Sequence, residues 1–172
     1  MVKKIIAGFC GVGKSELARK YSNVIDLEIM DYKWDYQMQI SNIEKRKGCV
    51  GRKRKKEWPN NYLEAIKKAI EDYDIVLIST DDEIIDLLDE YGMEYILCFP
   101  SKVCKNEYIE RYKGRGNTEE FIRKVSDTFE NLIDSLEIRR NKKIVLQPNE
   151  TLESKLQKVV QKSTQENDQE ER

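Results

Sequence analysis

The sequence predicts an α/β fold with a five-stranded parallel sheet and helices on both faces of that sheet. Short apolar runs alternate with amphipathic helical stretches along the 172 residues, and this alternation is typical of the β-α-β units that build a parallel sheet. The run Asp74–Ser79 is apolar on both faces, as expected for a strand between two layers of helices. The chain length suits one domain with a small insertion.

The individual elements are predicted from the spacing of apolar residues and from helix caps. The helix over 118–136 has the clearest pattern, because its apolar positions recur at helical spacing, and Asn117 or Thr118 is expected to cap it. Thr80 with Glu83 predicts a capping box at the start of the helix over 81–91. The other predicted elements are strands over 3–9, 24–28, 74–79, 94–99 and 143–146, and helices over 14–21, 62–73, 104–113 and 150–161.

The segment Gly8–Ser15 is the most informative part of the chain. It reads Gly-Phe-Cys-Gly-Val-Gly-Lys-Ser and fits the pattern G-x-x-x-x-G-K-[ST] between a predicted strand and a predicted helix. Its glycines let the backbone curl, so that successive N–H groups form a nest for phosphate oxygens. Lys14 is expected to reach the β- and γ-phosphates of ATP, and the Ser15 hydroxyl to bind Mg²⁺. The predicted ATP-binding residues are Gly8, Cys10, Gly11, Val12, Gly13, Lys14 and Ser15.

This loop also makes the fold prediction more specific. A phosphate loop after the first of five strands predicts the three-layer P-loop NTPase fold, in which ligands gather at the carboxyl ends of the strands. The alternative is a glycine-rich turn that binds nothing, and that alternative leaves the Lys and Ser after the last glycine unexplained.

Composition excludes several kinds of chemistry. The chain has no histidine, so a histidine general base and a histidine metal site are both excluded. The net charge of −1 gives no overall attraction to nucleic acid or to a membrane. None of the four cysteines forms a C-x-x-C pair, and reduced thiols in a cytoplasmic protein are expected. No signal peptide or transmembrane helix is expected, because the apolar runs are too short.

Carboxylates follow the second predicted strand, where a ligand is expected. Asp26 and Glu28 share one face of that strand, and we expect them to hold Mg²⁺ together with Ser15. Asp31, with Asp26 and Glu28, is a candidate to accept a proton from a substrate hydroxyl, and the sequence leaves open which of the three acts on metal or substrate. Surface charge is the alternative interpretation of each. Asp81 and Asp82 follow the third strand, but a helix N-terminus favours acidic residues by itself, and we prefer that explanation.

A pair of arginines follows the fourth predicted strand. Arg111 and Arg115 lie four residues apart in the sequence, which places both guanidinium groups on one helix face. Two arginines aimed at a phosphoryl group stabilise the charge that develops during its transfer. Glu107 precedes Arg111 by four residues, so a salt bridge on a solvated helix face is the alternative.

The stretch 32–60 between the second and third strands is predicted to be a substrate-binding insertion. Its residues 45–56 include eight Lys or Arg and no acid, so this basic loop is expected to bind a substrate phosphate or a nucleic-acid backbone, with a solvated charge run as the alternative. Tyr32, Trp34 and Tyr36 either stack on a base or belong to the core. After the fifth strand, residues 147–149 lie where a purine could contact the backbone.

The chain resembles the small P-loop kinases, above all the nucleoside monophosphate kinases. The resemblance covers residues 3–160 and depends on GFCGVGKS, IDLEIMD and ERYKGRGN. It implies one kinase domain over 1–162, with the acceptor held by the insertion over 32–60. It also implies ATP and Mg²⁺ at Lys14 and Ser15, and a lid-like segment over about 104–117 in which Arg111 and Arg115 close over the transferred phosphoryl group.

The predicted function is ATP-dependent phosphoryl transfer to a nucleotide-type acceptor. A polynucleotide 5′-kinase or an RNA-linked ATPase is one alternative, because the basic loop over 45–56 makes nucleic acid a possible partner. A nucleotide-binding regulatory protein without turnover is another. The sequence leaves the acceptor and the oligomeric state open. The polar tail over 163–172 is predicted to be disordered.

Overall fold

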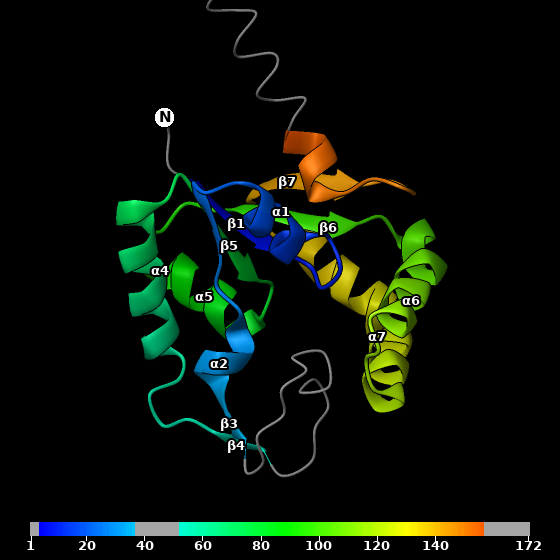
Figure 1. The fold of residues 1–172 in the computed structure, drawn as a ribbon, viewed down its shortest axis with the longest axis horizontal. Helices are drawn as coiled ribbons and strands as arrows, with labels where there is room; N and C mark the ends of the chain where they lie inside the picture. The colour runs from blue at the N-terminus through cyan, green and yellow to red at the C-terminus, as the bar shows by residue number, and fades with distance from the viewer. Residues whose placement is uncertain (1–3, 37–51, 157–172) are drawn as a thin grey trace, which may run out of the picture.

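The computed structural model describes residues 4–36 and 52–156. The fold is α/β: five parallel strands form a sheet flanked by helices, in the order β2-β5-β1-β6-β7 (Figure 1). These strands are β1 (Lys4–Gly8), β2 (Val24–Asp26), β5 (Ile75–Ser79), β6 (Ile96–Pro100) and β7 (Lys142–Leu146). The prediction of a five-stranded parallel sheet is confirmed.

The helices lie between these strands along the chain. They are α1 (Lys14–Lys20), α2 (Ile29–Lys33), α4 (Asn60–Asp72), α5 (Asp82–Glu90), the 3₁₀ turn η1 (Lys102–Cys104), α6 (Lys105–Gly114) and α7 (Glu119–Glu137). Residues 152–156 are also helical. Among the residues that the structure covers, no helix is long and apolar enough to span a membrane.

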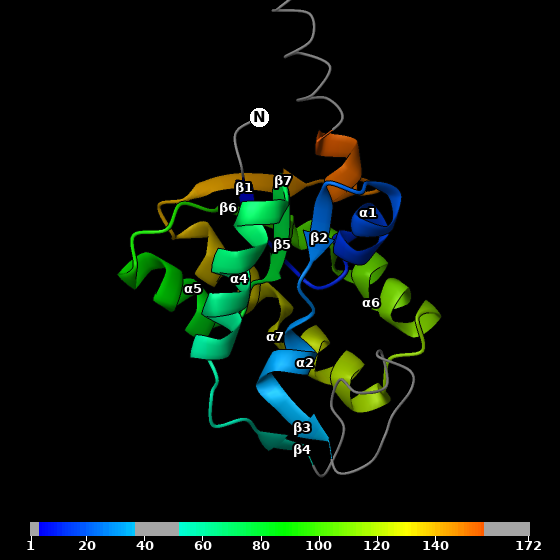
Figure 2. The ribbon, with the colours of Figure 1, turned by 60° about the vertical axis from the view of Figure 1, so that its left-hand side comes forward.

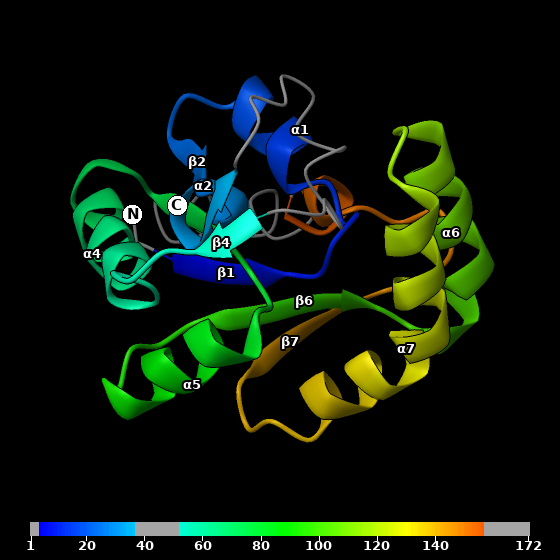
Figure 3. The ribbon, with the colours of Figure 1, turned by 90° about the horizontal axis from the view of Figure 1, so that it is seen from below.

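The direction of the strand connections decides which face each helix covers. The connection from β1 to β2 runs one way along the sheet, and the later connections run the other way. Because parallel crossovers are right-handed, the two directions place their helices on opposite faces. Figure 3 shows α1 on one side of β1 and β6, and α5 and α7 on the other. The helix α4 packs against β5 and α5.

The insertion after β2, over which the sequence predicted no helix or strand, has regular structure. The helix α2 is followed by a two-stranded antiparallel sheet of β3 (Trp34–Tyr36) and β4 (Arg52–Arg54). We call β3 and β4 the hairpin. Figure 2 shows α2 and the hairpin beyond the carboxyl end of β2, so the insertion lies at the edge where ligands of a parallel sheet gather.

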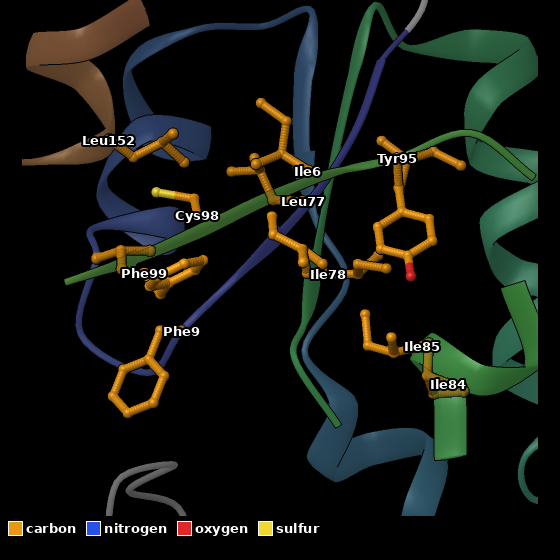
Figure 4. Packing of buried hydrophobic residues seen from close by; sticks show 14 of the residues in the cluster. Ile6, Phe9, Leu77, Ile78, Ile84, Ile85, Tyr95, Cys98, Phe99 and Leu152 are labelled. Atoms are coloured by element: carbon orange, nitrogen blue, oxygen red, sulfur yellow. The ribbon is translucent and has the colours of Figure 1, made fainter. Parts of the chain in front are cut away.

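The core lies between the central strands and the helices on both sides. Side chains from β1, β5 and β6 meet there (Figure 4), and they have no exposed surface: Ile6, Leu77, Ile78, Cys98 and Phe99. Each of these three strands is buried on both faces, which explains their continuous apolar runs. The Cys98 thiol belongs to this core, and burial raises its pKa to about 12, which keeps it in the unreactive thiol form.

The cap of α5 and the end of β2 differ from the sequence prediction, and the cap of α7 is one of the two predicted. Asp81, not Thr80, caps α5, since its side chain accepts a hydrogen bond from the Glu83 backbone N–H at 3.2 Å. The strand β2 ends at Asp26, because Glu28 leaves the sheet and caps α2. Of the two predicted caps of α7, Thr118 is the one used, with its hydroxyl accepting from the Phe121 N–H.

Some predictions concern residues outside the described ranges. They are the first residue of the predicted strand over 3–9, most of the basic loop over 45–56, the end of the helix over 150–161 and the polar tail over 163–172.

Candidate functional site

The glycine-rich loop between β1 and α1 has a backbone that only its glycines tolerate well. Gly11 and Gly13 have φ angles of 95° and 100°, in the region where other L-residues are strained. A Cβ atom on Gly11 would lie 3.1 Å from the Tyr108 ring and 3.2 Å from the Tyr112 ring. A Cβ atom on Gly8 would lie 2.9 Å from Val12. Gly11 is therefore favoured by both torsion and space, Gly13 by torsion alone and Gly8 by space alone.

Lys14 and Ser15 follow at the start of α1. Gly13 is the N-cap residue of that helix, and no side chain caps it. The first N–H groups of α1 thus face the loop without a side-chain acceptor, an arrangement that favours an anion. The Lys14 ammonium folds back over the loop, where it donates to the Gly8 carbonyl at 2.8 Å and to the Phe9 carbonyl at 3.3 Å.

The helix α6 holds the opposite side of the loop. The Tyr112 hydroxyl donates to the Cys10 carbonyl at 2.7 Å, and the Arg111 guanidinium donates to the Gly11 carbonyl at 2.9 Å. Arg111 also pairs with Glu107. The Cys10 and Gly11 carbonyls are therefore bound from α6, and within the loop the Val12 N–H donates to the Phe9 carbonyl at 3.3 Å.

The chain after β7 supports the loop from a third direction. The Leu152 backbone N–H donates to the Val12 carbonyl at 3.0 Å. The Asn149 N–H lies 3.1 Å from a carboxylate oxygen of Glu107, so residues 147–152 are tied both to the loop and to α6. Leu152 therefore lies against the loop and Asn149 against α6, and the contact of a purine with residues 147–149 stays a prediction.

The end of β2 brings a carboxylate to the loop. The Ser15 hydroxyl donates to Asp26 Oδ2 at 2.6 Å. The other oxygen, Asp26 Oδ1, is buried and makes no hydrogen bond with the described residues. The backbone there is fixed from both sides, since the Leu27 N–H donates to Leu77 in β5 at 3.0 Å and the Leu27 carbonyl accepts from the Tyr62 hydroxyl at 2.5 Å. Burial raises the pKa of that Tyr62 hydroxyl well above its ordinary value, so it stays a donor.

Two adjoining pockets lie at this edge of the sheet. The first, which we call the loop pocket, has a volume of about 180 Å³, and Lys14, Asp26 and Glu28 supply its charged groups. The second, which we call the hairpin pocket, has a volume of about 310 Å³ and extends toward Trp34 and Arg52. Both pockets are lined by Cys10, Ile29, Met30, Ser79 and Phe121.

Ion pairs hold the insertion against the start of α5. The Lys33 ammonium lies 2.6 Å from Asp81 Oδ2 and 4.9 Å from the centre of the Trp58 ring. Arg54 in β4 forms two hydrogen bonds of 2.9 Å with the carboxylate of Glu83. The hairpin is thus bound to α5 through side chains that lie far apart in the sequence.

The predicted site residues do not all lie together. The structure brings Gly8, Gly11, Gly13, Lys14, Ser15, Cys10, Val12, Asp26 and Glu28 to the loop or its pocket. Arg111 is half-buried against the loop, whereas Arg115 is exposed beyond the last residue of α6. Asp31 is exposed on α2 and lines neither pocket. Of the three strand-two carboxylates, Asp26 and Glu28 therefore stand at the site.

Several residues at the site had no recognisable signal in the sequence. Lys33 and Lys124 come from α2 and α7, and both line the hairpin pocket. Tyr112 binds the loop from a position 102 residues further along the chain. Asp81 was explained by the preference of a helix N-terminus for acidic residues; it caps α5 in place of Thr80, and it also pairs with Lys33. No spacing rule links these positions, since they meet only in the folded chain.

The described parts of the chain hold no group of three or more Cys, Asp and Glu side chains arranged around a metal position. At the loop, one carboxylate and one hydroxyl stand together at Asp26 and Ser15. This pair suits Mg²⁺, which keeps several waters and is commonly bound by one or two protein ligands together with substrate phosphates.

No protein-family model matches this chain, and a search of curated proteins finds no significant match. The geometry of the site and the motif in Gly8–Ser15 are therefore the observations that bear on function.

Proposed function

We propose that this protein is an ATP-dependent phosphotransferase that transfers the γ-phosphoryl group of ATP to a nucleotide-type acceptor. The observation that carries the proposal is the glycine-rich loop: Gly11 and Gly13 take left-handed torsions directly before α1, with Lys14 and Ser15 at the first two positions of that helix. A backbone of this kind is suited to the phosphates of a nucleotide.

The residues present fit a triphosphate with Mg²⁺. A Cβ atom would lie 2.9 Å from the Val12 side chain at Gly8 and 3.1 Å from the Tyr108 ring at Gly11, so the loop backbone packs closely against these side chains. Asp26 Oδ1 is a buried oxygen with no hydrogen bond among the described residues, which is the kind of atom that a water ligand of Mg²⁺ would satisfy. Ser15, Asp26 and Glu28 are the residues that would hold the metal.

In the proposed reaction an acceptor oxygen forms a bond to the γ-phosphorus while the bond to the β–γ bridging oxygen breaks, and ADP leaves. Lys14 stabilises the charge on the phosphate oxygens, and the N–H groups of the loop orient them. Mg²⁺, when bound, neutralises charge on the same phosphates. The protein therefore contributes mainly position and electrostatics.

The chemical nature of the acceptor decides if the reaction needs a general base. A phosphate oxygen acceptor is already ionised near neutral pH and needs no strong base. A hydroxyl acceptor would need a general base, and of the candidate carboxylates Asp26 and Glu28 line the loop pocket. Arg111 and Arg115 remain the proposed arginines for the developing charge. Arg111 stands nearer, because it already binds the Gly11 carbonyl.

The test is a coupled ADP-release assay with Mg²⁺·ATP over ribonucleotides, deoxynucleotides, nucleosides and oligonucleotide 5′ ends. We expect ADP release to rise at least tenfold with a nucleotide acceptor. Lys14→Ala is expected to abolish ATP binding and turnover while the far-ultraviolet circular dichroism stays unchanged, because within residues 4–36 and 52–156 the Lys14 ammonium donates only to backbone carbonyls.

Three results would contradict the proposal. Turnover that survives Lys14→Ala would show that the loop is not the active site. Tight ATP binding with the same ADP release across all acceptors would favour a regulatory nucleotide-binding protein. Stimulation by oligonucleotides alone would favour a polynucleotide 5′-kinase or an RNA-linked ATPase. Lys4→Ala is a suitable control, since Lys4 lies at the opposite end of β1.

A further inference from the structure

We propose that Tyr112 is a positioning residue for the nucleotide: its hydroxyl fixes the peptide between Cys10 and Gly11, so that the Gly11 N–H faces the phosphates of ATP. This inference rests on the proposed function in one respect, namely that the glycine-rich loop binds a triphosphate. It assigns a role to a residue of α6 that lies 102 positions from its partner in the loop.

The position of the Tyr112 hydroxyl is fixed by its surroundings. The side chain is fully buried, and its ring packs edge-on against Tyr108 and Phe121, with ring centres 6.3 and 5.4 Å away. The hydroxyl donates to the Cys10 carbonyl at 2.7 Å. Burial, followed by the nearby Cys10, raises the pKa of this hydroxyl well above its ordinary value, so it stays a donor.

The torsional preference of Gly11 does not fix the orientation of this peptide. Rotation of the peptide plane changes ψ of the residue before it and φ of the residue after it, which is Gly11. Glycine adopts positive and negative φ about equally readily, so the φ of 95° at Gly11 is one of two orientations open to it. The hydrogen bond from Tyr112 favours the orientation that the structure shows.

The same hydrogen bond sets the direction of the Gly11 N–H. The peptide between Cys10 and Gly11 is trans, and in a planar trans peptide the C=O and the N–H point in opposite directions. Because the Cys10 carbonyl points to α6, the Gly11 N–H points away from α6. It makes no hydrogen bond within residues 4–36 and 52–156, so it is a donor that an anion in the loop can use.

The next peptide of the loop is bonded within the protein on both sides. The Gly11 carbonyl accepts from the Arg111 guanidinium at 2.9 Å. The Val12 N–H donates to the Phe9 carbonyl at 3.3 Å. The N–H of this second peptide is therefore already used. Of these two neighbouring peptides, the one that Tyr112 holds is the one whose N–H remains for a ligand.

Tyr108 offers a comparison within the same helix. Both tyrosines are fully buried, and a Cβ atom on Gly11 would lie 3.1 Å from the Tyr108 ring and 3.2 Å from the Tyr112 ring. The Tyr108 hydroxyl, however, makes no hydrogen bond with the described residues. The two side chains thus share burial and contact with the loop, and they differ in the bond to the Cys10 carbonyl. A pair of Tyr→Phe variants isolates that bond.

The experiment compares Tyr112→Phe with Tyr108→Phe in the full chain. Isothermal titration calorimetry measures the binding of Mg²⁺·ATP and of inorganic tripolyphosphate with Mg²⁺. We expect Tyr112→Phe to bind both ligands about fivefold more weakly or worse, as the loss of one hydrogen bond predicts, and Tyr108→Phe to stay within twofold of the wild type. Tripolyphosphate has no base or sugar, so an equal loss for both ligands places the effect at the phosphates. Unchanged affinities in Tyr112→Phe would overturn the inference.

The amide cross-peak of Gly11 in a ¹H–¹⁵N spectrum reports the peptide directly. Without ligand, we expect it to move or broaden in Tyr112→Phe and to change much less in Tyr108→Phe. In the wild type it is expected to shift when tripolyphosphate binds, and this readout stands even if Tyr112→Phe folds poorly. A wild-type Gly11 cross-peak that ignores the ligand would show that its N–H does not face the phosphates and would overturn the inference.

Steady-state kinetics separate positioning from a general loss of stability. An N–H that binds the phosphates equally in the ground state and the transition state contributes uniform binding. Tyr112→Phe is therefore expected to raise the KM for ATP about fivefold and to leave kcat within twofold. A lower kcat with an unchanged KM is the pattern of a smaller folded fraction, and it would count against a contact to bound ATP.

The outcomes also distinguish this inference from the proposed function. ATP binding that depends on Tyr112, without turnover for any acceptor, would support the inference and contradict the phosphotransferase proposal. Loss of ATP binding in Lys14→Ala together with unchanged binding in Tyr112→Phe would overturn the inference and leave the proposed function standing.

Discussion

Gly11 is the residue on which the shape of the loop depends most. Its φ of 95° lies in the left-handed region, and the rings of Tyr108 and Tyr112 lie 3.1 and 3.2 Å from the position that a Cβ atom would take. These two constraints differ in kind. The torsion costs about 1–2 kcal/mol for a residue with a Cβ atom, whereas the collision depends on how far two buried rings are able to move.

Gly11→Ala is expected to destabilise the protein more than Gly92→Ala. Gly92 also has a positive φ, of 62°, but no atom lies within 4 Å of its Cβ position, so it reports the torsion alone. We expect Gly11→Ala to lose about 1–3 kcal/mol more, from overpacking against Tyr108 and Tyr112. Urea unfolding of both variants measures this difference. Equal losses would show that the rings move aside without resistance.

At the scale of elements, the hairpin is joined to α5 by a small network around Glu83. The carboxylate of Glu83 accepts from the Trp58 indole and from Arg54. The Trp58 N–H, followed by the charges of Lys33 and Arg54, holds the pKa of Glu83 below its usual value against the effect of its burial. The network thus depends on the ionised form of one side chain.

Removal of this charge is expected to change how stability depends on pH. A carboxyl group whose pKa is lower in the folded state stabilises the fold above its unfolded pKa and loses that effect as pH falls through its folded pKa. Glu83→Gln should therefore be less stable than the wild type at pH 7, and the difference should shrink as pH falls below 4.5. The measurement is the urea midpoint of both proteins at pH 7, 5, 4 and 3.

Glu90→Gln is the control for this series, because Glu90 is exposed in the last turn of the same helix. It is expected to follow the wild type closely at every pH. A constant gap between Glu83→Gln and the wild type across the whole series would show that the Glu83 charge does not support the network.

For the whole molecule, the glycine-rich loop connects parts that are distant in sequence. It receives hydrogen bonds from Tyr112 and Arg111 in α6 and from Leu152 after β7. Asp26 in β2 reaches it through Ser15. A ligand bound to the loop therefore acts on contacts made by most of the fold, and its binding free energy adds to the stability of the folded state.

Mg²⁺·ATP is expected to raise the melting temperature of the wild type. At 100 times the dissociation constant the stabilisation is about 2.7 kcal/mol, which corresponds to about 5–10 °C for a chain of this size. Lys14→Ala is expected to show no such shift. Thermal unfolding followed by circular dichroism, with and without Mg²⁺·ATP, measures both. An equal shift in the two proteins would place the nucleotide elsewhere.

The predictable part of the site was the part that is contiguous in the chain. Gly8–Ser15 carries its own spacing, and its neighbours were predicted as a strand and a helix, as β1 and α1 are. The carboxylate at Asp26 was predictable because β2 ends there and parallel strands end at one edge. The cap of α5 was not, since Thr80 and Asp81 both satisfy the preference for a short polar residue.

The hairpin pocket shows why the other residues of the site could not be predicted from the sequence. Lys33, Arg52 and Lys124 come from three elements, and a single lysine or arginine carries no sign that it will face a pocket. Asp31 shows the converse. It belongs to the same acidic run as Asp26, but α2 begins at Ile29 and turns the Asp31 side chain to the surface.

The amino-acid sequence alone determined the alternation of strands and helices and the chemistry of the loop over residues 8–15. Both depend on neighbours in the chain: the period of apolar side chains sets the element, and the order of glycine, lysine and serine sets the loop. Only the tertiary structure decided which charged side chains share a pocket and which lie on the surface. That choice depends on the sheet order and on the packing of α2, α6 and α7, which bring together residues up to about a hundred positions apart.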